Sequence, residues 1–211
     1  MFQENCPVTS ARMRKLQIPL SFFALLLLSA CSPRDFLSRR LAFDLIAQSP
    51  SFRTMQRFEL HTGVVSNDDY LAPEDLALQH HGWITATQTP CPAGITPPPC
   101  WDLTLTPSGV ETFQPLIPPS DAEKKSLTLL VARRELLAVT GISAQGNNAE
   151  AEFLWRWTPL NEVGAALYHP DQHFRSTAAL RKFDDGWRLA RGTPRPAPSL
   201  EDSLRSPEPV P

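Results

Sequence analysis

The sequence has no block of like charge and no glycine-rich loop of the kind that holds phosphates. Its 211 residues include 20 Lys and Arg against 22 Asp and Glu, a formal net charge of −2. Nucleic-acid-binding proteins owe much of their affinity to basic surfaces that neutralise phosphates. We therefore expect no nucleic-acid partner.

Residue patterns of nucleophilic catalysis are also missing. Ser108 and Ser143 lack the G-x-S-x-G context of a nucleophile elbow. The carboxylate pairs Asp68-Asp69 and Asp184-Asp185 lie in turn contexts, where Asp is favoured for local hydrogen bonding. We predict a protein that is not an enzyme and uses no cofactor.

Glycine is scarce and proline abundant, with nine and 22 residues respectively. Proline interrupts helices, so long uninterrupted helices are not expected. The 42% of hydrophobic residues still suffices for a folded core.

Long hydrophobic runs are limited to residues 16–28, which follow Met13-Arg14-Lys15. As a helix this run spans about 20 Å, less than the roughly 30 Å hydrocarbon core of a bilayer. A basic start before a short apolar run is typical of a signal peptide. We predict a signal peptide over residues 1–30, with Met13 as a candidate start because Glu4 and Cys6 do not suit a signal-peptide n-region.

The tetrapeptide Leu28-Ser29-Ala30-Cys31 resembles the lipobox of bacterial lipoproteins. The resemblance implies cleavage before Cys31, a diacylglyceryl group on its thiol, and a further acyl chain that makes anchoring to the membrane firm. Ser32 after the lipidated residue favours the periplasmic face of the outer membrane. The alternative is an ordinary cleaved signal peptide with an incidental cysteine.

Export to an oxidising compartment predicts a disulfide between Cys91 and Cys100, because Cys6 lies in the predicted leader and the lipobox resemblance implies that Cys31 is lipidated. Closing their loop is expected to stabilise the fold by about 2.5–3 kcal/mol through chain entropy. The gain is smaller here because four prolines already stiffen the unfolded loop. A zinc site is the alternative, although the C-x-x-C spacing of such sites is missing.

Residues 31–113 are predicted to form a helix and hairpin module. Apolar spacing over 32–53 indicates an amphipathic helix, and boundary signals indicate a second over 72–82. Alternating runs over 83–88 and 101–106 flank the cysteine loop and predict a disulfide-closed β-hairpin.

This order of helix, strand, loop and strand resembles the helix-and-wing portion of winged-helix domains. The residues that match are Leu76, Leu78, Gly82, Ile84, Leu105, Thr106 and Gly109. The matching helix has no basic residue, so the resemblance implies a local fold and no DNA binding.

A proline-rich linker is expected over 114–126, followed by an antiparallel sheet region over 127–192. The sheet is predicted to have about four strands, over 133–142, 149–157, 174–183 and 187–191. Residues 193–211 are proline-rich and predicted to be a disordered tail. The fold class is therefore α+β.

Two groups of residues are candidate sites. Phe153, Trp155 and Trp157 share one strand face, with Trp187 on a neighbouring strand, and such a face can bind an apolar ligand or simply form the core. His169 and His173 are weak candidates for metal ligands, with a polar loop as the alternative.

Together these patterns predict a lipid-anchored cell-envelope protein with a non-enzymatic binding or assembly role and a possible envelope protein partner. The alternatives are a small periplasmic metal-dependent hydrolase that uses His169 and His173, and a carrier of an apolar ligand over the Trp155 face.

Overall fold

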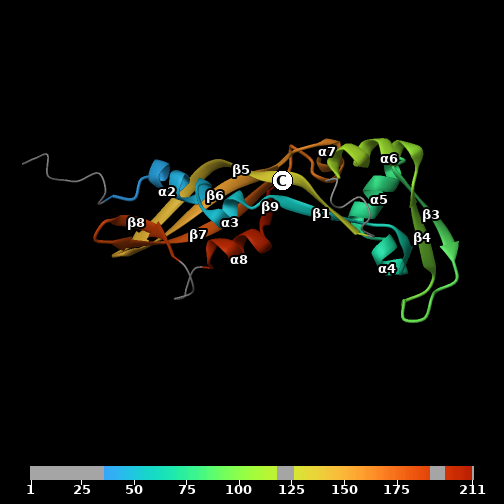
Figure 1. The fold of residues 1–211 in the computed structure, drawn as a ribbon. Helices are drawn as coiled ribbons and strands as arrows, with labels where there is room; N and C mark the ends of the chain where they lie inside the picture. The colour runs from blue at the N-terminus through green and yellow to red at the C-terminus, as the bar shows by residue number, and fades with distance from the viewer. Residues whose placement is uncertain (1–35, 118–125, 191–197, 211) are drawn as a thin grey trace, which may run out of the picture. The chain divides into compact units, whose positions relative to one another are not determined.

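The computed structural model describes residues 36–117, 126–190 and 198–210. It contains helices, a six-stranded antiparallel sheet and a three-stranded antiparallel sheet (Figure 1). Residues Leu37–Pro211 form one compact unit. The predicted signal peptide, the predicted lipidation site Cys31 and residues 118–125 of the predicted linker lie outside the described residues. None of the helices in the described ranges is long and apolar enough to cross a bilayer.

The first described helices are α2 (Arg39–Ala47) and α3 (Pro50–Arg53). Each begins at a serine whose hydroxyl accepts a backbone hydrogen bond: Ser38 from the amide of Leu41, and Ser49 from the amide of Phe52. Such caps satisfy amides that a helix leaves without partners. The predicted helix region 32–53 thus contains two helices in its described part, and Pro50 starts the second.

The large sheet has the strand order β1 (Gln56–His61), β5 (Ser126–Gln145), β6 (Asn148–Pro159), β7 (His173–Phe183), β8 (Gly186–Leu189), with β9 (Glu208–Val210) also on β7. The prediction of about four strands is therefore too low. The two additional strands come from outside the predicted sheet region. Because β1 pairs with β5, strand pairing crosses the predicted boundary at 114–126.

The alternation predicted for the central strand is confirmed. Along β6, Ala149, Ala151, Phe153 and Trp155 are buried and the residues between them are partly exposed. The predicted hairpin that follows is also present, since β7 pairs with β8 through a turn in which Gly186 has a φ of 129°. Residues other than glycine rarely adopt that backbone conformation.

The prediction of a disordered tail needs correction for residues 198–210. These residues contain α8 (Leu200–Arg205), capped by Ser199, and the edge strand β9, which pairs with His173–Arg175. Leu200 and Leu204 are buried in the core. Burial of these two leucines offsets part of the conformational entropy that the tail loses when it becomes ordered.

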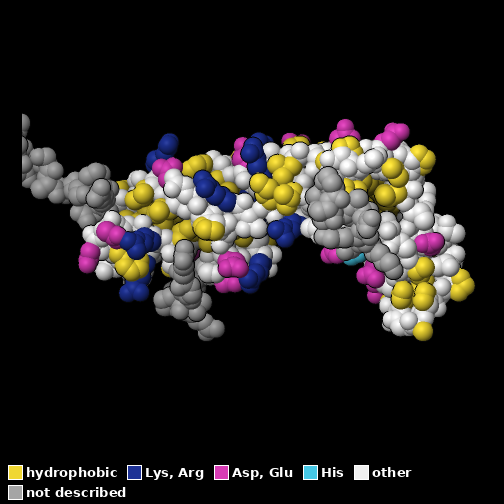
Figure 2. Space-filling model, viewed as in Figure 1, with side chains coloured by type: hydrophobic (Ala, Val, Ile, Leu, Met, Phe, Trp, Pro, Cys, Tyr) yellow, Lys and Arg dark blue, Asp and Glu magenta, His cyan; other side chains and the backbone are white. Residues whose placement is uncertain are grey.

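The smaller sheet has the order β2 (Gly63–Val65), β4 (Cys100–Leu105), β3 (Ile84–Thr89), beside α4 (Asn67–Tyr70) and α5 (Pro73–His80). The predicted Cys91–Cys100 disulfide is present and closes the β3–β4 loop. The order of α5, Gly82, β3, loop and β4 is the one that carried the winged-helix resemblance. The tip of this hairpin shows hydrophobic and uncharged side chains (Figure 2).

Most of the buried apolar side chains in the described part of the chain belong to two groups. The Trp155 core lies where α2, α3 and α8 meet the large sheet, and it includes Ile46, Phe52, Phe153, Trp155, Trp187 and Leu204. The Phe113 core lies under α5, α6 (Pro107–Phe113) and α7 (Glu162–Leu167), and it includes Phe58, Leu78, Trp83, Phe113, Val131 and Val163. A short 3₁₀ helix, η1 (Gln114–Leu116), follows α6.

Candidate functional site

The predicted aromatic face lies mostly within the Trp155 core. Phe153 and Trp155 are fully buried, and Trp187 is 7% exposed. The ring of Phe52 packs edge-to-face against Phe153 and Trp155, with centroids 6.2 and 6.4 Å apart. Trp157, at the end of the row, is half-buried. Most of this face therefore stabilises the fold, and the part with surface open to a ligand is Trp157, at the end next to Trp155.

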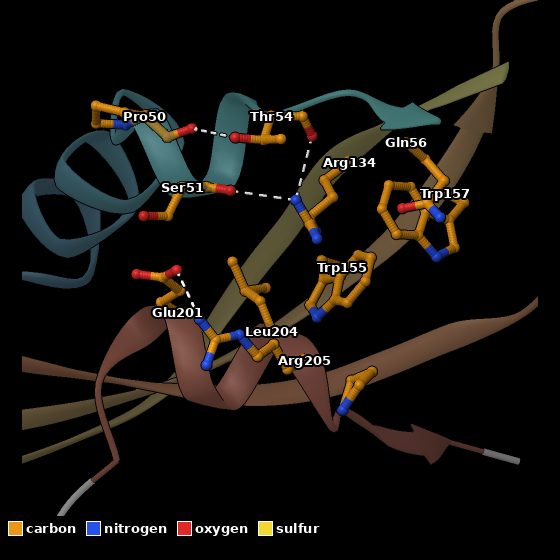
Figure 3. A pocket seen from close by; sticks show the side chains of 11 residues that line it. Pro50, Ser51, Thr54, Gln56, Arg134, Trp155, Trp157, Glu201, Leu204 and Arg205 are labelled. Carbon is orange, nitrogen blue, oxygen red and sulfur yellow. Dashed lines mark hydrogen bonds and ion pairs between the residues drawn. The ribbon is translucent and has the colours of Figure 1, made fainter. Parts of the chain in front are cut away.

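That end forms a wall of a cavity of about 610 Å³. α3 contributes one side, the strands β5 and β6 the floor, and α8 the opposite side (Figure 3). The two indoles meet edge-to-face, with ring centroids 5.1 Å apart. The cavity thus combines aromatic surface with polar groups from three separate parts of the chain.

Arg134 on β5 supplies the cationic group of this cavity. Its Nη1 donates to the backbone carbonyls of Ser51 and Thr54, over 3.1 and 3.2 Å (Figure 3). Its guanidinium carbon lies 4.7 Å from the ring centroid of Trp157 and 5.5 Å from that of Trp155. The strand register explains this placement, because Arg134 is directly opposite Trp157 on β6.

The positive charge of Arg134 has no acidic partner in the described part of the chain. No Asp or Glu there forms an ion pair with it. Its Nε is buried and lacks a hydrogen-bond acceptor among the same residues. Burial lowers the pKa of this guanidinium below its usual value. An unpaired cation with an unsatisfied donor is costly to bury, and a bound anion would offset that cost.

The opposite wall is held in place by hydrogen bonds between α8 and the sheet. The indole Nε1 of Trp155 donates to the hydroxyl of Ser176 over 3.0 Å, and that hydroxyl donates to the carbonyl of Ser203 over 3.2 Å. The Ser203 hydroxyl accepts the amide of Thr177. On the same helix, Arg205 pairs with Glu201 over 2.9 Å. Trp155 is therefore fixed between the sheet and α8.

Our sequence analysis did not identify Arg134 as a site residue. The available signal was a cation within an apolar strand. Without the register between β5 and β6, nothing in the sequence aligns Arg134 with Trp157. The two carbonyls that it contacts lie about eighty positions away in sequence.

The predicted histidine pair does not form a metal site in the described part of the chain. His169 is exposed in a turn, where its carbonyl accepts the amide of Gln172. His173 begins β7, opposite Arg156 and Val210. No three His, Cys, Asp or Glu side chains among the described residues are grouped to hold a metal ion. The zinc alternative for Cys91 and Cys100 is wrong, because these residues are bonded to each other.

A second buried ionisable group, also absent from our predictions, is Asp75 in the first turn of α5. It is 8% exposed, and burial raises its pKa to about 6. The nearby His61 acts in the opposite direction, and the carboxylates of Glu74 and Asp69 add to the increase. Asp75 can therefore gain or lose a proton under mildly acidic conditions.

Comparison with known proteins identifies no relative of this chain. No protein-family model matches the chain, and neither a curated protein nor a solved structure is significantly similar to it. The geometry of the Arg134 cavity is therefore the basis for interpreting function.

Proposed function

We propose that this chain is a lipid-anchored protein of the bacterial cell envelope whose folded part binds an anionic ligand in the Arg134 cavity. The role is that of a binding component and not of an enzyme. The lipobox-like sequence at Cys31 supports the anchor, and the cavity supports the binding role. A possible partner is another envelope molecule that carries an acidic group.

The observation that carries the binding role is the unpaired Arg134 guanidinium. In most folded proteins a half-buried arginine has an acidic partner or satisfied donors. Here Nη1 is satisfied by two carbonyls, while Nε and the charge itself have no partner in the described residues. This is the arrangement of a receptor group whose counter-charge arrives with the ligand.

The chemistry of the cavity favours an acid group attached to a ring or another flat apolar group. With Nη1 bonded to two carbonyls and Nε buried, Nη2 is the part of the guanidinium left to donate to a carboxylate or phosphate, and each charge-assisted hydrogen bond contributes about 1.5–3 kcal/mol. The half-buried indole of Trp157 offers an aromatic surface beside the guanidinium. Benzoate is a simple probe with both features.

Titration of the full mature chain with benzoate tests the binding role. We expect saturable quenching of tryptophan emission, because Trp155 and Trp157 line the cavity. Benzyl alcohol, which lacks the charge, should bind at least about tenfold more weakly. Arg134→Gln should lose benzoate affinity to a similar extent, and Arg134→Lys should recover it only in part, because lysine lacks the planar fork.

Arg133→Gln is the matched control. Arg133 adjoins Arg134 in β5, but its side chain is exposed and does not line the cavity. Equal benzoate affinity in Arg133→Gln and the unchanged protein supports the proposal. An equal loss of benzoate affinity in both variants would mean that any nearby positive charge suffices, which contradicts a specific site at Arg134. Unchanged benzoate affinity in Arg134→Gln would refute the site.

The anchor has a separate test in cells that express the chain with its natural leader. Cys31→Ala should abolish incorporation of labelled fatty acid and release the protein from the membrane fraction. Cys6→Ala, in the predicted leader, should change neither. Retention of the label in Cys31→Ala would contradict lipidation at this residue.

A further inference from the structure

A second cavity adjoins the Arg134 cavity. Its volume is about 1270 Å³, and Pro50, Ser51 and Glu201 line both spaces. It continues from α3 and the start of α8 toward the β7–β8 hairpin. The two cavities together form an elongated space that is larger than a single small anion would fill.

The walls of the second cavity mix apolar and hydrogen-bonding side chains. Leu45 and Leu189 are partly exposed and offer apolar surface, whereas Gln145 and Asn148 offer side-chain amides. An acyl chain would cover such amides without satisfying them, which is unfavourable. An extended peptide has backbone amides and carbonyls that can bond to them, as well as side chains for the apolar surface.

The charge of the combined space is opposite to that of the whole chain. Its charged lining residues are four arginines and two glutamates, Arg134, Arg181, Arg188, Arg205, Glu150 and Glu201, in a chain of net charge −2. At the far end, the guanidiniums of Arg181 and Arg188 lie 5.6 and 5.4 Å from the ring of Phe183. Arg188 is already paired with Asp185 and Arg205 with Glu201, whereas Arg134 has no ion-pair partner in the described residues, so an anion is favoured at the Arg134 end.

We infer that the combined cavities bind an extended peptide segment by its free C-terminal carboxylate. The carboxylate would bind Arg134, the last side chain would lie against Trp157, and the preceding residues would pass α3 into the second cavity. This inference rests on the proposed binding role of Arg134 and adds the class of ligand.

Peptides of three, five and seven residues test this inference on the full mature chain. Each alternates Ala and Leu, ends in Phe, is acetylated at its amino end, and is made with a free or an amidated carboxyl end. We expect the free seven-residue peptide to bind at least about tenfold more tightly than the free three-residue peptide. Amidation should lower the affinity by a similar factor, and Arg134→Gln should remove the difference between free and amidated forms.

The variant Ser143→Trp tests the contribution of the second cavity separately from that of the Arg134 cavity. Ser143 is exposed and lines only the second cavity, so an indole there should remove the gain with peptide length and leave benzoate binding intact. Ala144→Trp is the matched control, since the next residue along β5 is also exposed and does not line either cavity. Circular dichroism would verify that both variants fold.

The outcomes distinguish this inference from the proposed function. Arg134-dependent benzoate binding without any gain from peptide length overturns the peptide inference alone. A gain with chain length from hexanoate to dodecanoate, absent for peptides, overturns it in favour of an acyl ligand. Loss of Arg134-dependent binding for every probe overturns both.

Discussion

A charged side chain that burial affects lies beside each of the two cores of this protein, and these two side chains differ in how their charge can be satisfied. Arg134 lies over the ring of Trp155 in the Trp155 core, and Asp75 is on α5, which also carries Leu78 of the Phe113 core. An aspartate can become neutral by binding a proton, and burial raises the pKa of Asp75 to about 6. A guanidinium stays charged at any physiological pH. The first group is therefore suited to a response to pH, and the second requires a counter-charge.

The surroundings of the two groups match that difference. Arg134 opens onto a cavity and has aromatic rings beside it. Asp75 lies at the start of a helix, where the helix dipole favours negative charge, but two other carboxylates act against it. Variants that change one core and not the other can test whether the cores are independent.

The largest expected effect is on the link between the Phe113 core and the large sheet. A Cβ on Gly164 in α7 would lie 1.9 Å from the carbonyl oxygen of Val131 on β5. Gly164→Ala must therefore push α7 away from the sheet, and we expect a loss of about 3–5 kcal/mol in the free energy of unfolding, measured with urea.

Gly141→Ala is the control for this steric argument. The nearest atom to its Cβ, the Cβ of Glu152, would lie at an ordinary 3.8 Å. A small effect of Gly141→Ala beside a large effect of Gly164→Ala supports close packing at α7. Similar losses of stability in the two variants would mean that the cost comes from replacing any glycine, and not from the short distance between Gly164 and Val131.

The disulfide should stabilise the hairpin without influencing the Arg134 cavity. Replacing both Cys91 and Cys100 by Ala should lower the free energy of unfolding by about 2–3 kcal/mol, through loss of the loop constraint. Benzoate affinity should remain unchanged in the folded variant, measured by tryptophan emission. A parallel loss of affinity would show that the two regions are coupled.

Asp75 should make stability depend on pH. Because its native pKa of about 6 exceeds the unfolded value near 3.8, the native state holds the proton more tightly. The resulting stabilisation is complete below about pH 4 and is lost as the pH rises through 6. Asp75→Asn should flatten this slope and raise stability at pH 7 by about 2 kcal/mol, since the loss of favourable helix-dipole charge offsets part of the gain.

Urea unfolding at pH 4 to 8 provides the measurement for this prediction. Glu111→Gln serves as control, because Glu111 is an exposed carboxylate on α6. A slope that persists in Asp75→Asn would assign the pH dependence to other groups.

The smallest expected effect concerns the helix that supplies carbonyls to Arg134. Ser49 caps α3 through the amide of Phe52, so Ser49→Ala should cost about 1 kcal/mol in the free energy of unfolding. It should also weaken benzoate binding, because Arg134 bonds to the carbonyls of Ser51 and Thr54. Ser38→Ala, which removes the corresponding cap of α2, should cost similar stability without that loss of affinity.

Local patterns predicted much of this fold. The alternation of β6, the Gly186 turn and the Cys91–Cys100 pair each depend on residues close in sequence. β1 and β9 were missed because their place in the sheet is decided by pairing with distant strands. The aromatic row was recognised, but its separation into core and cavity depends on where α3 and α8 pack.

The same limit applies to the candidate site. Arg134 acquires its environment from Ser51 and Thr54 in one segment and from Trp157 in another, and both are distant from it in sequence. A charge in an apolar strand can indicate a special position, but periodicity alone cannot distinguish an inward arginine from an edge residue.

The position of α8 and β9 has a practical consequence for protein production. A designer trimming a proline-rich terminus to aid crystallisation would cut before Ser199. That cut would remove Leu204 and Pro207 from the cavity wall and free the β7 backbone at His173–Arg175 to pair with other molecules. Shortened versions should therefore aggregate.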